Sequence, residues 1–567
     1  MKRITIYAFI AFCFSVNLAK AQTIPVGTPV LDDYYRRLQL SGGIDSNISF
    51  AIRPIYPSVK NIRHDAFNPD SADNEKWTST GPFYFAKGAG KVQILPLLWQ
   101  QQFNSNHPYG WNDGLMIPAK GYQTMISGGV FFKYGPLTIQ LRPEYVYAAN
   151  PAFTGFASGH GDADLTAYYN YHNLIDNPER FGNGSYTKAS LGQSSIRLTF
   201  GPISFGLSNE NLWWGPGIRN SLILSNNAPG FKHVTINTVR PVNTPIGSFE
   251  VQVIGAKLEN TDLPPLAVTT TSTGANLYRT RRDDWRYYSG FNINYHPKWV
   301  PGLFLGLTRA FDAYQKDIKG FNAYVPFFTP YAKSSINPDG SQGDAFDRDQ
   351  VTSLYARWLF TKAKAEVYFE YGLNDNSYNM NDFLGAPEHS RAYIFGMRKL
   401  VALNNKPGEG ILFSGEITQL SQSIDRTVRQ ASGWYIHSGV RQGMTNEGQV
   451  IGAGTGSGGN LQSVDISWVR GLKKLGLLFE RYEHDVDFQQ AFLPDVSNYS
   501  RKWVDFGVGL QGDWNYKNLL FNAKLEGIQS LNYEWILKNY NPASSNYYIP
   551  NNSVFNVHME LGVMYRF

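Results

Sequence analysis

The densest set of side chains that could bind a ligand lies in a short segment near the middle of the chain. Trp213 and Trp214 could stack on the C–H faces of sugar rings, because flat aromatic side chains pack well against apolar ring faces. The groups that could hydrogen-bond to hydroxyls or carboxylates follow them, and are Arg219, Asn220, Asn226 and Asn227. The alternative is structural: the tryptophans anchor the rim of a barrel at an interface. Gly215, Pro216 and Gly217 then only shape the turn, and the residue types favour this alternative.

One polar cluster could support catalysis. It lies at the end of a strand-like segment and consists of Glu480, Glu483, His484, Asp485 and Asp487. Such a mixture of carboxylates and a histidine could be the acid/base site of a barrel hydrolase. The competing interpretation, which we favour, is a hydrated rim at the end of the strand.

Signals for metal and phosphate sites are weak. The carboxylates within His160–Asp164 could bind a cation, but a polar loop is the favoured interpretation. Gly452–Gly459 is rich in glycine and lacks the Gly-Lys-Ser/Thr of a phosphate-binding loop, and Ser457 is not in a Gly-x-Ser-x-Gly elbow. The sequence has no His-Glu-x-x-His zinc motif. We therefore expect no enzymatic activity, no metal and no cofactor.

In the segments that would position these residues, apolar and polar side chains alternate with a period of two. In the last segment the apolar positions are Phe555, Val557, Met559, Leu561, Val563, Tyr565 and Phe567. Polar or small residues lie between them, except at Met564. Because successive side chains of a strand point to opposite faces, one face suits lipid and the other a wet lumen. An aromatic last residue on such a strand resembles the assembly signal of bacterial outer-membrane proteins.

The opening residues predict export. Lys2 and Arg3 precede an apolar run from Ile4 to Val16, and Ala19-Lys20-Ala21 fits a small-x-small cleavage pattern. We expect a signal peptide over residues 1–21, cleaved before Gln22. Cys13, the only cysteine, lies within it, so the mature chain would have no disulfide and no thiolate metal site.

Composition sets further limits. The chain has 567 residues, of which 15% are aromatic, which suits aromatic girdles at the two edges of a membrane barrel. Mean hydropathy is −0.32, as expected when only every second residue meets lipid. Net charge is +6, and removal of Lys2, Arg3 and Lys20 leaves +3 (6 − 3). This charge is too weak to indicate nucleic acid.

Alternating segments recur along the chain and predict roughly 16 to 20 strands in one all-β, transmembrane antiparallel barrel. We assign residues 22–90 to an N-terminal periplasmic segment or plug with a helix over Pro29–Leu40, and residues 91–567 to the barrel. Asn209–Gly247 is expected to be one long loop. A further strand is expected near Gly448–Gly454, because the strands after Phe360 do not alternate cleanly in direction.

The tryptophan segment, together with Asn220–Pro229, resembles the hallmark of the capsule-assembly Wzi family. Pro297–Arg309, Gln350–Phe369 and Gly448–Gly452 resemble further segments of that family, in the same order. The resemblance covers roughly residues 90–567, and the tryptophan motif is fairly specific to it. The N-terminal segment matches less clearly.

The resemblance implies a barrel of about 18 strands with a small helical element at the periplasmic mouth. Members are lectin-like and hold capsular polysaccharide at the cell surface, so the partners would be surface polysaccharide and outer-membrane lipid. Polysaccharide export machinery is a further candidate partner, nucleic acid is not, and we expect a monomer. Arg279, Arg281 and Arg282 are candidates for binding an acidic sugar, although a solvated loop with internal ion pairs is favoured.

Two other functions stay open at this point. A porin would need an open lumen lined by charged rings, and the sequence does not show whether the lumen is open. An outer-membrane hydrolase would use the cluster around Glu483 and His484. The leading hypothesis is a non-enzymatic, polysaccharide-binding protein of the outer membrane that attaches or assembles capsule.

Overall fold

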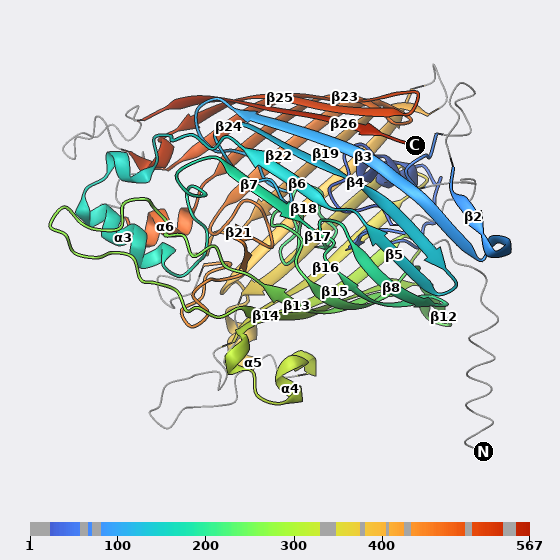
Figure 1. Ribbon diagram of the computed structural model, residues 1–567, viewed down its shortest axis with the longest axis horizontal. Helices are drawn as coiled ribbons and strands as arrows, with labels where there is room; N and C mark the ends of the chain where they lie inside the picture. The colour runs from blue at the N-terminus through green and yellow to red at the C-terminus, as the bar shows by residue number, and fades with distance from the viewer. Residues whose placement is uncertain are drawn as a thin grey trace.

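The computed structural model describes residues 23–56, 66–70, 81–328, 348–374, 380–403, 408–423, 433–493, 502–536 and 552–567. Within these residues the chain forms a closed antiparallel barrel crossed by 18 strands (Figure 1). This confirms the fold class expected from the alternating segments. The signal peptide expected over residues 1–21 lies outside the described residues.

The wall of the barrel is built from strands that follow one another along the chain. Their bounds are β3 Gly90–Asn104, β4 Gly121–Tyr134, β5 Leu137–Leu141, β6 Glu144–Ala148, β7 Tyr186–Ser190, β8 Ser195–Phe200, β9 Ile203–Ser208, β11 His233–Thr238, β12 Val242–Thr244, β13 Gly247–Leu258, β14 Arg286–Pro297, β15 Leu303–Tyr314, β16 Asp349–Phe360, β17 Ala365–Asn374, β18 Arg391–Ala402, β19 Glu409–Gln419, β22 Asn460–Arg470, β23 Lys473–Glu483, β24 Val504–Tyr516, β25 Leu519–Leu531 and β26 Val554–Tyr565. Three strands of the wall are each divided into two short pieces, which are β5 and β6, β7 and β8, and β11 and β12. Among the described residues, β2 (Phe83–Phe85) pairs only with β3. Pro143 separates β5 from β6, since proline has no N–H for the ladder.

The remaining elements are short and are not part of the wall. The helices are α2 Leu31–Leu40, η1 Ala86–Gly88, η2 Phe156–Gly159, α3 Asp162–His172, η3 Gln315–Asp317, α4 Phe321–Tyr324, η4 Pro326–Phe328, α5 Met380–Gly385, α6 Val486–Ala491 and η7 Tyr533–Trp535. Two small ladders pair β1 (Ile52–Arg53) with β10 (Trp213–Trp214) and β20 (Thr445–Asn446) with β21 (Gln449–Val450). No helix in the described part of the chain is long and apolar enough to cross a membrane.

The outward faces of the strands are apolar and the inward faces polar. On β26, Phe555 and Leu561 are 57% and 46% exposed, whereas Asn556 and His558 between them are fully buried. The same pattern holds around the wall, so the outer surface presents a continuous set of exposed Leu, Ile, Val and aromatic side chains. An exposed apolar surface of this extent is typical of a membrane-facing barrel.

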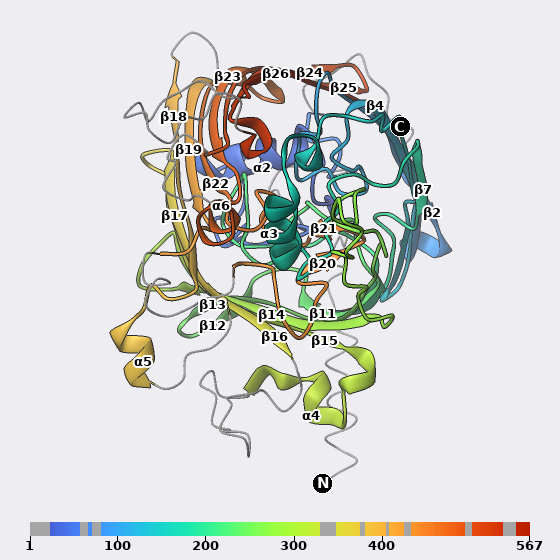
Figure 2. The same cartoon turned by 90° about the vertical axis from the view of Figure 1, so that its left-hand side faces the viewer.

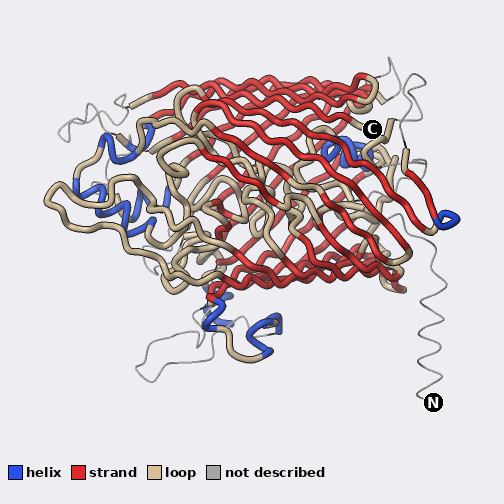
Figure 3. The backbone as a smooth tube through the Cα atoms, in the orientation of Figure 1, coloured by secondary structure: helices blue, strands red, loops and turns tan. Residues whose placement is uncertain are grey.

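The two ends of the barrel differ. β26 ends at the turn end, where short connections such as residues 135–136, 201–202 and 517–518 join neighbouring strands. The opposite end, here called the loop end, has the long connections, α3 and α6. Figure 2 looks onto the loop end and shows α3, α6, β20 and β21 within the ring of strands, with α4 and α5 outside it. Figure 3 shows loops crossing the interior of the barrel.

Two expectations about strand positions are wrong. Asn209–Gly247 is not one loop, because its second half contains β11 and β12; the alternation there has only two apolar residues, Val234 and Ile236, and is easily missed. The segment near Gly448–Gly454 adds no strand to the wall. Its only described strand, β21, pairs with β20 inside the barrel, and the directions of the wall strands alternate regularly without it.

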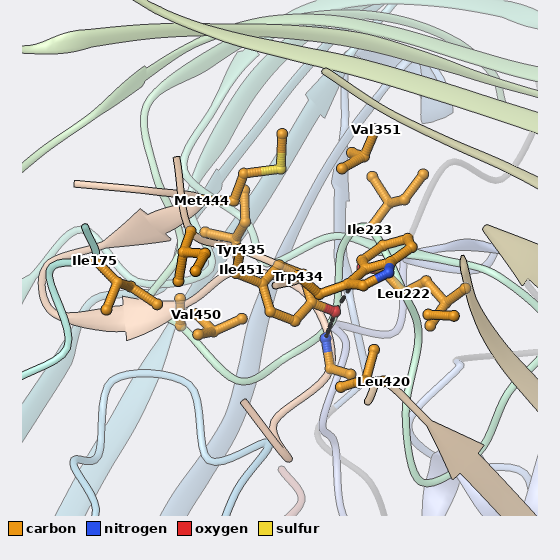
Figure 4. Close-up of a cluster of buried hydrophobic side chains, with 14 of the residues drawn as sticks. Ile175, Leu222, Ile223, Val351, Leu420, Trp434, Tyr435, Met444, Val450 and Ile451 are labelled. Atoms are coloured by element: carbon orange, nitrogen blue, oxygen red, sulfur yellow. Dashed lines mark hydrogen bonds between the residues drawn. The ribbon is translucent and has the colours of Figure 1, made fainter. Parts of the chain in front are cut away.

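Loop segments fill the lumen and form a core of their own. The lumen segment, residues 209–232, packs against residues 433–459, and Figure 4 shows the buried side chains where they meet. Tyr435 lies at the centre, with its hydroxyl donating to the carbonyl of Leu222 (2.8 Å) and accepting from the amide of Ala453 (2.8 Å). The interior is therefore a packed body rather than an open pore.

The N-terminal segment, residues 23–56, is held inside the turn end by buried charges. Arg36 of α2 donates to the Glu366 carboxylate on β17 (2.8 Å), and Arg357 on β16 pairs with the same carboxylate (2.5 Å). Arg398 on β18 pairs with Asp33 of α2. The Arg36, Arg357 and Glu366 side chains are at most 3% exposed, so each charge depends on its partner.

Replacing Glu366 by Ala should destabilise the barrel by about 3–5 kcal/mol, because the buried guanidinium groups of Arg36, Arg357 and Arg398 lose their shared carboxylate. Guanidinium unfolding of the detergent-solubilised protein, followed by tryptophan fluorescence, measures the change. Asp283→Ala removes an exposed carboxylate at the loop end and serves as the control. Equal stability of the two variants would contradict the role given to Glu366.

Candidate functional site

The structure places both tryptophans of the central motif inside the barrel. They form β10, which pairs with β1, and Trp214 is fully buried with its Nε1 donating to Gln252 (2.8 Å). Trp213 is 3% exposed, and the Arg53 guanidinium lies 4.8 Å from the centre of its ring. Neither ring is at the rim of the barrel, so anchoring at an interface does not describe them. Neither has a broad face open for stacking in this conformation.

The turn after the tryptophans encloses a carboxylate from the wall. Glu416 on β19 accepts the backbone N–H groups of Ile218 (2.6 Å) and Asn220 (2.8 Å), and that of Arg219 between them (3.1 Å). A Cβ at Gly217 would lie 1.9 Å from the carbonyl oxygen of Asn220, so only glycine fits there. The motif is therefore a joint between the lumen segment and the wall.

The polar residues that follow the turn bind other parts of the protein. Asn220 donates to Thr418 (3.1 Å), Asn226 to the carbonyl of Asn112 (2.7 Å) and Asn227 to that of Val450 (2.8 Å). Arg219 pairs with Glu480 (2.5 Å), and its guanidinium lies over the ring of Trp111 (5.6 Å). These contacts join loops that are far apart in sequence. A ligand role for these residues stays a prediction.

The three candidate arginines lie apart from the tryptophans, in the loop between β13 and β14 at the loop end. Arg281 is buried and pairs with Asp176 (3.4 Å). Arg282 pairs with Asp317 (2.5 Å), and its guanidinium lies 4.5 Å from the centre of the Tyr314 ring. Arg279 is exposed. Arg281 and Arg282 have the internal ion pairs of the interpretation favoured from sequence, but Arg281 is buried and not solvated. A role in sugar binding stays a prediction for all three arginines.

The acidic residues that the sequence suggested for catalysis or cation binding also pair with other side chains of the protein. Glu480 binds Arg219, Glu483 binds Lys502 (2.9 Å), and the His484 ring pairs with Asp505 (2.8 Å). Their contacts point to different partners and do not form one acid/base pair. His160 pairs with Asp164 (2.8 Å). No group of three His, Cys, Asp or Glu suited to a metal ion occurs among the described residues.

A cavity of about 260 Å³, the outer cavity, lies at the loop end. It is formed by the connection between β3 and β4, the segment around α3, residues 449–457 and the ends of β23 and β25. Aromatic rings dominate its lining: Tyr109, Trp111, Phe153, Tyr168, Tyr482, Trp503, Tyr533 and Trp535. Trp503 is half-buried and stacks on the His484 ring at 3.6 Å. Aromatic faces beside hydrogen-bonding groups suit the amphipathic rings of sugars.

A second cavity of about 330 Å³, the inner cavity, lies deeper in the lumen. Tyr109, Gly110 and Trp111 line both cavities. The inner lining is charged and includes Arg36, Arg53, Asp113, Arg219, Arg398, Asp513, Lys524 and Glu560, together with Trp213. Trp213 therefore borders a cavity, and its Nε1 has no hydrogen-bond partner among the described residues.

Burial sets the charge of the outer cavity. Burial lowers the pKa of His107 to about 4 and that of His172 to about 3, so both imidazoles are neutral at physiological pH. Burial also raises the pKa of the Glu534 carboxyl well above its usual range, with the nearby Glu179 adding to the shift. Burial and the neighbouring Asp487 do the same for Asp485. In each of these groups burial opposes the charged form.

Sequence reasoning missed the outer cavity. Its residues are spread from position 107 to position 535 and belong to loops with no shared motif. The one signal available was the recurrence of single aromatic residues in the long loops, as at Trp111, Trp503 and Trp535. Only the closure of the barrel brings these loops to one end.

The chain matches the family model described as capsule assembly protein Wzi over residues 120–529. Among solved structures it is similar to Wzi of Escherichia coli, described as an outer-membrane protein involved in group 1 capsule assembly and a carbohydrate-binding β-barrel. That similarity has a TM-score of 0.59 with 12% identity, over 96% of this chain and 100% of that chain.

Lower similarities are to OccAB2 of Acinetobacter baumannii (TM-score 0.39, 9% identity, 84% of this chain and 98% of that one). The similarity to a BenF-like porin from Pseudomonas fluorescens Pf-5 has a TM-score of 0.38 with 9% identity, over 84% of this chain and 99% of that one. A comparison with curated proteins found no match. At these identities the solved structures show the fold alone, whereas the family model covers most of this chain.

Replacing Glu416 by Ala should lower the free energy of unfolding by about 3 kcal/mol, because three backbone donors and the hydroxyl of Tyr368 lose one acceptor group. Glu416→Gln keeps one acceptor oxygen and should cost less. Guanidinium unfolding in detergent gives both values. If Glu416→Ala unfolds like the unmodified protein, the turn does not depend on this carboxylate.

Proposed function

The chain belongs to the Wzi capsule-assembly family, and on that premise we propose that it is an outer-membrane protein that binds surface polysaccharide without catalysis. Its role would be to attach or assemble capsule at the cell surface. The apolar outer face of the barrel supports the membrane location. A signal peptide over residues 1–21, cleaved before Gln22, would direct the export, and the barrel would act as a monomer.

The loop end would face the outside of the cell, as the long loops of such barrels do, and the turn end the periplasm. The N-terminal segment would then close the periplasmic mouth. Export machinery that delivers polysaccharide is a candidate partner at either end.

The observation that carries the proposal is the outer cavity. It lies at the loop end, is walled by aromatic rings, and includes polar groups that a sugar could bind. By contrast, the candidate catalytic residues Glu483 and His484 are each held by another partner, Lys502 and Asp505. This arrangement favours binding over hydrolysis.

Deleting the gene should release polysaccharide from the cell surface while secretion continues. Cell-associated and shed polysaccharide, measured separately, give the result. A drop in both pools would instead indicate a part in synthesis or export, and unchanged attachment would contradict the proposal. Restoring the gene with Trp503→Ala should give weaker attachment, because the variant removes a half-buried ring from the outer cavity.

The expected loss of affinity is about fivefold, since one aromatic contact is worth about 1 kcal/mol. Trp503→Phe keeps an aromatic face and should retain most of the binding. Trp299→Ala is the matched control, since Trp299 is 70% exposed on a turn at the opposite end. Barrel content of the outer membrane is compared in all strains, so that a folding defect is recognised.

Conductance separates this proposal from a porin. We expect planar bilayers containing the purified protein to show no large, steady single-channel current, because the lumen segment and the N-terminal segment fill the interior. Steady currents of the size seen with open porins would contradict the packed lumen. A known porin purified in the same detergent is the positive control.

A further inference from the structure

The outer cavity has an unusual distribution of charge. Among the described residues that line it there is no lysine or arginine, while Glu179, Asp485 and Glu534 provide three carboxyl groups. Arg219 lines the inner cavity instead. Its guanidinium lies over the ring of Trp111 and pairs with the Glu480 carboxylate. The cavity therefore offers acceptors and weak donors, and no lysine or arginine side chain among the described residues of its lining.

Several buried polar atoms of the lining have no partner in the described part of the protein. They are Nδ1 of His107, Oγ1 of Thr455 and Nε1 of Trp535. His107, Thr455 and Trp535 are at most 3% exposed. An unpaired buried polar group costs free energy, and these three atoms belong to side chains of the cavity lining.

We propose that the outer cavity binds a non-acidic sugar residue, either neutral or bearing an amine, and rejects uronic acids. The inference rests on the proposed function and names its ligand class. Sugar hydroxyls and amines can donate to the Glu179, Asp485 and Glu534 carboxyls and stack on the rings beside them. A sugar carboxylate would lose its water without meeting a cation, and it would face three acidic groups.

The size of the cavity agrees with a short part of a chain. At about 260 Å³ it has room for a sugar residue with part of its neighbour. The outer cavity lies at the loop end, so the polymer would enter and leave there.

The raised pKa values of Asp485 and Glu534 agree with this choice. Protonated carboxyls both donate and accept hydrogen bonds, which matches hydroxyl groups. An amine can be accommodated by release of a proton from a carboxyl. As pH rises and these carboxyls ionise, an acidic sugar should be rejected more strongly.

The test uses the full-length mature protein in detergent and three tetrasaccharides of matched length: cellotetraose, the chitosan tetramer and tetragalacturonic acid. Calorimetric titration at about pH 7.5 should show binding of cellotetraose or the chitosan tetramer. Tetragalacturonic acid should bind at least tenfold more weakly. Glu179→Gln with Glu534→Gln should narrow that gap, because the double variant removes two of the three carboxyl groups of the lining.

Glu388→Gln is the matched control, since Glu388 is exposed on the loop between β17 and β18. Equal or tighter binding of tetragalacturonic acid would overturn the inference and leave the proposed function standing. If cavity variants do not change binding while deletion still releases polysaccharide from cells, the inference also fails alone. No binding of any sugar, together with unchanged capsule attachment in the deletion strain, would overturn the proposed function as well.

Discussion

The interior of this barrel depends on a carboxylate in its wall that backbone amides surround. Glu416 lies on β19, and the turn after the two tryptophans brings three successive N–H groups to it. On the other side of the same turn, Arg36 donates to the carbonyl of Pro216 (2.7 Å) and Arg53 to that of Gly217 (3.0 Å). Wall, lumen segment and N-terminal segment therefore meet at one turn.

This connection holds the lumen segment and the N-terminal segment inside the barrel, where they occupy much of the lumen. Inward faces of large barrels are polar, and here the polarity includes charges that are almost completely buried. A buried charge that loses its partner is strongly destabilising. Arg36 and Asp33 belong to the N-terminal segment, so removing the segment would take one partner each from Glu366 and Arg398 in the wall. The filling is thus part of the folded state.

Much of the fold could be predicted from the sequence, because a period of two is a direct consequence of strand geometry. β24 and β26 show it clearly. β11 was missed because its inward positions, His233, Thr235 and Asn237, outnumber its two apolar ones. The two-residue strands β20 and β21 inside the barrel are too short to have a period. The candidate site was harder to predict from the sequence. The conspicuous tryptophan motif connects the lumen segment to the wall, and the outer cavity consists of scattered aromatic residues that only tertiary structure brings together.

The closing pair of the barrel has a consequence for its biosynthesis. β3 near one end of the chain pairs with β26 at the other, and Asn104 meets His558 there (2.8 Å). Until the ribosome has made the last strand, no intermediate can close. Every shorter chain therefore leaves β3 with an unpaired edge beside its apolar outward side chains, which is the combination that promotes aggregation. This edge of β3 is therefore covered against self-association only when β26 pairs with it.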